Sequence, residues 1–457
     1  MKMKHMWKVT IGLLVAMMLL VSCSSGSGKS GDSGNAGGSG SNSGAVSSGQ
    51  GSGSDSGSNS GEVVELKFWD MVWGPTEYIE TAQKLVEQFN AEHPNIKVTY
   101  QSTPWANWYQ TFTTAIAAGA GPDISTGAGY QAFQFYDMDA ILPIDDVIEE
   151  LRANGTLDDF YTGAIDTMLY DNHYVAMPWG IDIRVWYYRK DLFEQAGVSV
   201  PKTFEEFREA MKKLSGNGKY GLVVHAVDNG GVQFLLTTMI NNGGGIFTED
   251  KKVDFMNERN IETFRWIADM VKDGSIDPAS TGYKQEDATK AFGSGTAAVH
   301  LTTPSFKDEL PELADKLGII PPMEGLHGDK GSLRWVNNIM IYSATKHPEE
   351  AKTFLKWWIE NNKPLWTEGH TGQLPVRISV AQDPYFQEDP ILKQVLDEYV
   401  PIGKPTGTHY PAAFPELNEI EGEGVLHTLS QEVLLGKDPV EAMEKAEKRF
   451  KEIMREQ

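Results

Sequence analysis

The chain has 457 residues, with 40 Lys and Arg against 63 Asp and Glu, and a single Cys. At about 100–200 residues per domain, this length suits roughly two to four domains or one large two-lobed body. One cysteine excludes an intramolecular disulfide framework and a cysteine-based zinc cluster. The formal net charge of −23 argues against nucleic acid as a partner, because binding to phosphates requires a basic surface.

The first 22 residues have the composition of a secretion signal. Lys2, Lys4 and Lys8 precede the apolar run 11–21, which is too short to span a bilayer as a stable helix. The run ends in Leu-Val-Ser directly before Cys23, which resembles the lipobox of bacterial lipoproteins. We expect residues 1–22 to be a lipoprotein signal peptide and Cys23 to carry lipid; the alternative is an ordinary secretory signal with a chance cysteine.

Residues 24–61 consist almost entirely of Gly, Ser, Asn and Asp. Such a segment has nothing to bury, so we expect a disordered Gly/Ser-rich tether over 23–61. A lipid, a tether and then a globular body describe a protein anchored at the extracellular face of the bacterial cell membrane.

Strand and helix patterns alternate through the rest of the chain. Runs of β-branched and aromatic residues predict strands at 63–69, 96–100, 123–126, 187–188 and 221–225. Apolar residues at helical spacing predict helices at 77–92, 108–118, 204–214, 231–241, 261–273, 346–360 and 439–455. This alternation is typical of an α/β protein with mainly parallel sheets.

The sequence lacks the common motifs of enzymes. It contains no GxSxG, HExxH, Walker GxxxxGK[ST] or EF-hand pattern. The glycines at 243–245 lack the strand–GxGxxG–helix setting and are read as a helix end and turn. Carboxylate pairs such as Asp145 and Asp146 lie in charged runs, which favours a solvated face over paired acid–base chemistry. We expect a protein that is not an enzyme and binds neither cofactor nor metal.

Aromatic residues follow three successive predicted strands: Trp73 the first, Trp105 the second and Tyr130 the third. Ligands of α/β sheets bind outside the carboxyl ends of the strands. Aromatic faces suit the apolar faces of sugars, whereas Asp, Asn, Arg and Glu suit the hydroxyls. Trp69 and Trp108, by contrast, lie in the strand and helix patterns and are expected in the core.

Several segments together resemble the extracellular solute-binding proteins of ABC importers, in the sugar-binding branch that includes maltose-binding protein. They are AAGAGPDI at 117–124, MPWG at 177–180 with WYYRKDLF at 186–193, PKTFEEF at 201–207, AFGSGTAA at 291–298, LPVR at 374–377 and GKDPVEA at 436–442. They occur in the order known for that family, and the resemblance covers nearly all of the chain after residue 62.

The resemblance implies a two-lobed periplasmic-binding-protein fold, with a ligand cleft between lobes that close about a hinge. The first lobe would comprise 62–180 and 318–360, and the second 181–317 and 361–457. Hinge crossings would lie near 179–186, 317–319 and 360–364. The ligand would be a di- or oligosaccharide, delivered to the permease subunits of an ABC importer by a monomeric binding protein.

Ligand-binding residues are implied where this sequence matches the segments that line the cleft in the family. They are Asp70, Trp73, Trp105, Tyr130, Trp179, Asp182, Arg184, Trp335, Asn337, Trp366, Glu368, His409 and Phe414. Asp182 and Arg184 have an alternative reading as a structural ion pair.

One position departs from the family pattern. Many relatives carry a stacking Trp where this chain has Ser305, so Phe306 or Trp335 would have to replace it. Two other functions stay open: a carbohydrate receptor for a sensor kinase, and a secreted glycan-processing enzyme.

Overall fold

The structure is a computed structural model that describes residues 63–410 and 412–456. The predicted signal peptide, lipidated Cys23 and tether lie outside the described residues. Within the described ranges, no helix is both long and apolar enough to cross a membrane. The same ranges contain no group of three or more His, Cys, Asp or Glu side chains that could hold a metal ion.

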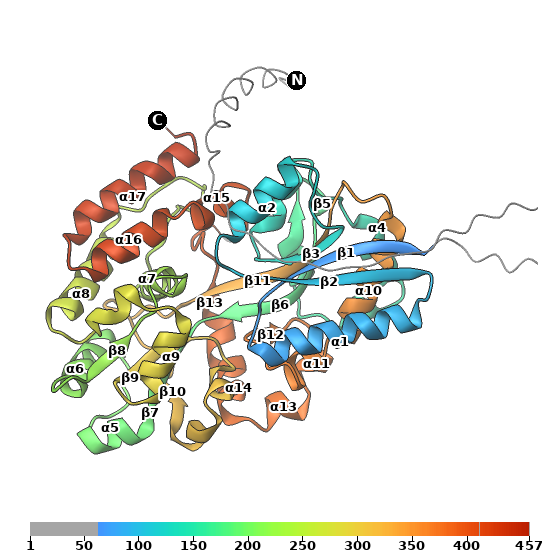
Figure 1. Ribbon diagram of the computed structural model, residues 1–457. Helices are drawn as coiled ribbons and strands as arrows, with labels where there is room; N and C mark the ends of the chain where they lie inside the picture. The colour runs from blue at the N-terminus through green and yellow to red at the C-terminus, as the bar shows by residue number, and fades with distance from the viewer. Residues whose placement is uncertain (1–62, 411, 457) are drawn as a thin grey trace, which may run out of the picture. The chain divides into compact units, whose positions relative to one another are not determined.

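The first lobe is built on a seven-stranded sheet with the order β12-β6-β11-β3-β1-β2, and β13 pairs with β11 (Figure 1). Its strands are β1 (Val64–Met71), β2 (Ile96–Thr103), β3 (Ile124–Gly127), β6 (Met177–Ile183), β11 (Ser332–Ile341), β12 (Leu374–Pro375) and β13 (Gly403–Lys404). Its helices are α1 (Thr76–Glu92), α2 (Trp108–Ala117), α3 (Gln131–Asp137), α4 (Asp145–Ala153), α10 (Pro348–Asn361) and α11 (Pro364–Thr367). A two-stranded hairpin is formed by β4 (Leu169–Tyr170) and β5 (His173–Tyr174).

Apolar alternation fixes the face of β1 that meets the helices. Leu66 and Phe68 are buried, whereas Glu65 and Lys67, which alternate with them, are exposed. The Phe68 ring centroid lies 5.0 Å from that of Phe354 on α10. This edge-to-face packing joins the sheet to its helical layer.

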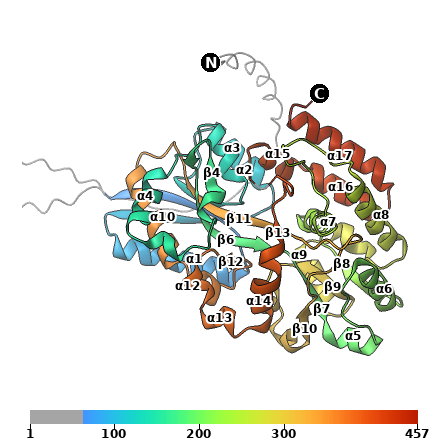
Figure 2. The same cartoon turned by 180° about the vertical axis from the view of Figure 1, so that it is seen from behind.

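The second lobe is built on a four-stranded sheet with the order β10-β7-β9-β8. Its strands are β7 (Val185–Arg189), β8 (Tyr220–Val223), β9 (Ala297–Thr302) and β10 (Leu317–Ile319). Its helices are α5 (Lys190–Ala196), α6 (Phe204–Leu214), α7 (Gly230–Asn241), α8 (Glu258–Lys272), α9 (Gln285–Gly293), α15 (Glu416–Gly422), α16 (Val425–Leu434) and α17 (Pro439–Ile453), the last two closing the side drawn in red (Figures 1 and 2).

The sheets are mixed, which differs from the mainly parallel sheets predicted. β1 runs parallel to β2 and β3, but β11 runs antiparallel to β3 and β6. In the second sheet β7 runs antiparallel to β9 and β10. The cause is the linkage of the lobes: β6 continues into β7, and the chain returns from β10 to β11. A strand that leaves a sheet and a neighbouring strand that returns to it must run in opposite directions.

Sheet membership also differs from the predicted lobe boundaries. Residues 317–319 form β10 and pair with β7 in the second sheet, rather than beginning the return to the first lobe. Residues 364–375 stay with the first lobe, because β12 pairs with β6 and Arg377 binds Asp159. The chain touches the second lobe again at α13 (Pro384–Gln387), where Tyr385 donates to Asp308 at 2.8 Å, and farther along, where Tyr399 donates to the carbonyl of Ile320 at 2.5 Å. The first crossing, at Arg184, lies inside the range predicted for it.

Candidate functional site

Six aromatic rings from five separate segments form a continuous set of contacts, here called the aromatic cluster. In order of contact they are Trp366, Trp179, Trp73, Trp105, Trp108 and Tyr130. Neighbouring ring centroids are 4.9–6.4 Å apart, within the range of aromatic packing. The strand-end positions predicted from the sequence therefore do meet in space, and Trp108, predicted as core, joins them.

Hydrogen bonds fix three indoles of the cluster. Trp73 Nε1 donates to Thr126 Oγ1 at 3.0 Å, and Trp105 Nε1 donates to the Val72 carbonyl at 2.7 Å. Trp366 Nε1 donates to the carbonyl of Gln373 at 2.8 Å. These bonds fix the orientation of the three indoles within the cluster.

Trp179 differs from these three because its buried Nε1 has no hydrogen-bond partner among the described residues. A buried donor without an acceptor costs free energy, and a ligand hydroxyl would relieve that cost. Trp358 on α10 shares this property inside the helical layer. The unpaired N–H of Trp179 therefore points to a ligand only because it lies within the cluster.

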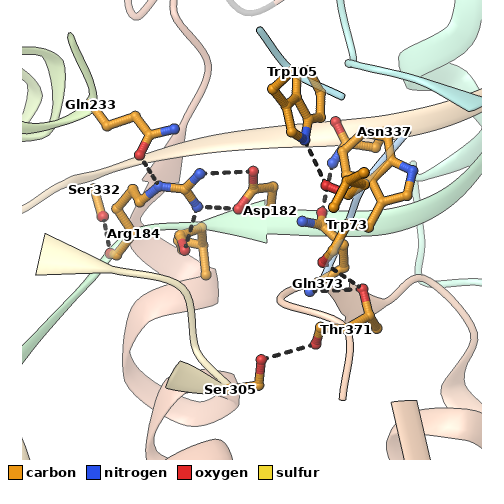
Figure 3. A network of polar contacts seen from close by, with 12 residues as sticks. Trp73, Trp105, Asp182, Arg184, Gln233, Ser305, Ser332, Asn337, Thr371 and Gln373 are labelled. Atoms are coloured by element: carbon orange, nitrogen blue, oxygen red, sulfur yellow. Dashed lines mark hydrogen bonds and ion pairs between the residues drawn. The ribbon is translucent and has the colours of Figure 1, made fainter. Parts of the chain in front are cut away.

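Asp182 and Arg184 form a buried ion pair beside the cluster (Figure 3). Both carboxylate oxygens accept from the guanidinium, and Arg184 Nη2 lies 3.0 Å from Asp182 Oδ2. Arg184 Nε donates to Gln233 Oε1 at 2.8 Å, and the guanidinium lies 5.4 Å from the ring centroid of Trp335. The structural pairing considered from the sequence is thus present. A paired carboxylate still has lone pairs for sugar hydroxyls.

Asp70 has a different setting from the one predicted. It is fully buried and accepts from the hydroxyls of Thr126 (2.6 Å), Tyr78 (2.8 Å) and Tyr100 (3.3 Å). Burial raises the pKa of Asp70 to about 7 even though these hydrogen bonds oppose the shift. With its oxygens occupied inside the first lobe, Asp70 supports Thr126, and so the indole of Trp73, from beneath.

Trp335 on β11 lies next to the ion pair, and Asn337 on the same strand lies beside Gln373. Trp335 is half-buried and faces Asp182 across the β11–β6 pairing. Asn337 is buried and donates to Gln373 Oε1 at 2.6 Å. Of the two candidates to replace a ring at Ser305, Phe306 is completely buried against Tyr187, whereas Trp335 is half-buried.

Three predicted residues lie outside these contacts. Phe414 is buried within the second lobe, where its ring centroid is 5.2 Å from that of Phe247. Glu368 and His409 are exposed, and neither makes a side-chain hydrogen bond to the cluster within residues 63–410 and 412–456. Both residues lie in loops, where the spacing of residues along the chain does not determine which way a side chain points.

The structure adds polar residues that the sequence did not reveal. Gln233 on α7 and Gln373 near β12 contact the ion pair and Asn337, respectively. Ser305 Oγ of the second lobe donates to the carbonyl of Thr371 at 3.0 Å. These contacts, drawn in Figure 3, join segments far apart in sequence, and no motif marks them.

Fold and site together define a two-lobed ligand-binding protein whose candidate site lies where the lobes meet. A family profile described as "Bacterial extracellular solute-binding protein" matches residues 74–362. The chain belongs to this family. It is a solute-binding protein, in agreement with the resemblance found in its sequence.

A solved sugar transporter from Arthrobacter chlorophenolicus A6 with bound laminaribiose is 37% identical, with a TM-score of 0.81, covering 85% of this chain and 99% of that one. A galactooligosaccharide-binding protein of Bacillus subtilis is 24% identical over 392 residues, 82% of this chain and 87% of that protein. An uncharacterised lipoprotein of Streptomyces antibioticus is 25% identical over 390 residues, 82% of this chain and 78% of that protein.

Proposed function

We propose that this protein captures a neutral di- or oligosaccharide between its two lobes and delivers it to the permease of an ABC importer. The observation that carries this proposal is the aromatic cluster. Six packed rings beside a hydrogen-bonding ion pair bring apolar surface and polar groups together, as sugar rings require. Several rings suit several sugar subsites, which favours an oligosaccharide over a monosaccharide.

The relatives support the same chemistry. The solved structure at 37% identity contains laminaribiose, so this disaccharide is the first ligand to test. Lobes that close on a bound sugar would present the permease with a surface that the open state lacks, which is a population shift driven by the ligand. The family and the reported relatives with a named activity are binding or transport proteins, so neither the receptor nor the enzyme alternative gains support.

We also propose that the protein acts as a monomer without catalysis, held outside the cell by lipid on Cys23. The extracellular family description and the lipoprotein of Streptomyces antibioticus support this placement. Its test is given at the end of the Discussion.

A thermal-shift screen tests the sugar proposal directly. A ligand that binds only the folded state raises stability by RT ln(1 + [L]/Kd), about 2.7 kcal/mol at a hundredfold excess over Kd. The panel is laminaribiose, galacto-oligosaccharides, maltose, and xylo-, manno- and chito-oligosaccharides. We expect at least one sugar to raise the melting temperature, with no product formed on prolonged incubation. A panel without any shift contradicts sugar binding, and released product contradicts a binding-only role.

A further inference from the structure

The indole of Trp335 is held at its edge by two residues that come after the last strand. Trp335 Nε1 donates to Thr406 Oγ1 at 3.0 Å and lies 3.3 Å from Glu421 Oε1. Thr406 Oγ1 in turn donates to the same carboxyl oxygen. With Arg184 against the ring, these contacts set the angle of Trp335 beside Asp182.

Glu421 reaches this ring from the opposite lobe. It lies on α15, which is fixed to the second lobe because Arg449 of α17 pairs with Glu419 at 3.2 Å and also with Glu423. Trp335 belongs to β11 of the first-lobe sheet. The hydrogen bond between Glu421 and Trp335 therefore links the lobes and would break if they separated.

We propose that Glu421 is a positioning residue for ligand binding, which fixes the ring of Trp335 against the sugar when the lobes close. This inference rests on the proposed function, but it does not require Glu421 to touch the sugar. A ring free to rotate pays an entropy cost on stacking, and a hydrogen bond made on closure removes that cost.

The protonation of Glu421 should make the affinity for sugar depend on pH. Burial between the lobes raises the pKa of Glu421 to about 7, although the hydrogen bonds from Thr406 and Trp335 oppose the shift. In separated lobes the carboxyl would face water, with an ordinary pKa of about 4.3. The titratable and charged groups that face it or lie on the elements around α15 are Tyr130, Asp182, Arg184, Tyr109, Lys251, Glu416, Glu419, Glu423 and Arg449. Burial raises the pKa of Glu419 to about 7 as well, so Glu419 contributes to the same pH window.

The sign of the pH dependence follows from the raised pKa in the closed state. Between pH 4.3 and 7, closure takes up a proton at Glu421, so ligand affinity weakens as the pH rises through that window. The limit for one proton is about tenfold in Kd per pH unit. Asp70, whose pKa is also raised, contributes little to this effect because its burial lies within the first lobe and does not depend on closure.

The test measures the affinity for laminaribiose by titration calorimetry at pH 5, 6, 7 and 8 on the full chain. If laminaribiose does not bind, the panel sugar that raises the melting temperature most takes its place. We expect Glu421→Ala to raise Kd about 5- to 30-fold, and Glu421→Gln, which keeps the acceptor, to bind within about threefold of wild type at pH 6. Glu421→Gln should also make the pH dependence shallower. Glu416→Ala, on the same helix but paired with Lys251, is the matched control and should bind normally.

The results separate the two proposals. Wild type that binds no panel sugar overturns the proposed function, and this inference falls with it. Wild type that binds while Glu421→Ala binds equally well overturns the inference alone, as does a pH dependence in Glu421→Gln that is as steep as in wild type. Melting of the unliganded variants close to wild type would show that a weaker affinity does not reflect misfolding.

Discussion

Two buried indoles, Trp179 and Trp358, share an N–H that is unpaired within the described part of the chain but differ in their surroundings. Trp179 and Trp358 are both completely buried, and both lack an acceptor for Nε1 among the described residues. Only Trp179 touches Trp73 and Trp366, which places it in the aromatic cluster that we propose binds the sugar. This contrast supplies a matched pair of variants.

We predict that Trp179→Phe weakens sugar binding by about 1–2 kcal/mol, roughly 5- to 30-fold in Kd. The variant removes an N–H that no described residue accepts, and it leaves an aromatic face for packing. Calorimetry with the panel sugar that binds wild type measures the change. Trp358→Phe is the control: it removes a similar volume, so it should lower the melting temperature by a similar amount and leave Kd unchanged.

Equal effects of the two variants on Kd would mean that Trp179 acts only through packing. The candidate site would then have to lie nearer to Trp335 and the ion pair than to Trp179.

The individual residues were predictable from the sequence to different degrees. Trp73, Trp105 and Tyr130 followed from the rule that ligands meet the carboxyl ends of strands, and the structure brings the three into one cluster. Asp70 lies near the end of β1, the strand that Trp73 follows. It is on the same buried face of β1 as Phe68, so its side chain points inward to Tyr78. Glu421 belongs to a segment that reaches the first lobe only through tertiary packing, so no local pattern could have marked it.

Among the elements, the amphipathic helices were predicted closely and the buried strands were not. Helix α6 has the predicted bounds because Thr203 caps it by accepting from the Glu206 N–H, and its apolar residues keep helical spacing. Strands β6 and β9 are buried along their entire length, so neither shows alternation. A fully buried strand cannot be recognised from periodicity alone. The antiparallel pairing of β11 depends on how the chain passes between the lobes, which no local pattern reports.

Helix α15 meets the first lobe through a close backbone approach. A Cβ added at Gly422, the last residue of α15, would lie 2.6 Å from the ring of Tyr109 on α2. Beside it, Asn418 Nδ2 donates to Gln134 Oε1 on α3. These contacts join the lobes at a place separate from the crossings, so they are expected to form as the lobes close.

We predict that Gly422→Ala weakens sugar binding about 5- to 10-fold, because the methyl group must push α15 away from α2 and disfavour the closed state. Such overpacking typically costs 1–3 kcal/mol. Only the part of this cost that is absent from the open state lowers the affinity for sugar. Calorimetry gives Kd, and the unliganded melting temperature should stay near that of wild type. Gly282→Ala, placed in open space in the second lobe, is the control and should change neither. Unchanged affinity in Gly422→Ala would show that this contact does not depend on closure.

The composition of the N-terminal segment differs from that of the two lobes. Residues 24–61 contain only three apolar residues, Ala36, Ala45 and Val46, whereas the described part buries a large apolar core in both lobes. Binding should therefore depend on the lobes, and attachment on Cys23. Two lobes that each keep their own sheet can move as units about the segments that join them.

We predict that Cys23→Ala releases the protein from membranes, or leaves it unprocessed, without changing its affinity for sugar. The motivation is Leu-Val-Ser before a cysteine at the end of an apolar run, where lipid transfer requires the thiol. Membrane fractionation and mass spectrometry of the N-terminus measure attachment, and calorimetry on detergent-solubilised wild type against the variant measures binding. A chain that starts at Glu62 is the control for the lobes, and it should melt cooperatively with wild-type affinity. A Cys23→Ala protein that is still processed and membrane-bound would contradict lipid attachment at this residue, and lost binding in the chain from Glu62 would show that the N-terminal segment supports the lobes.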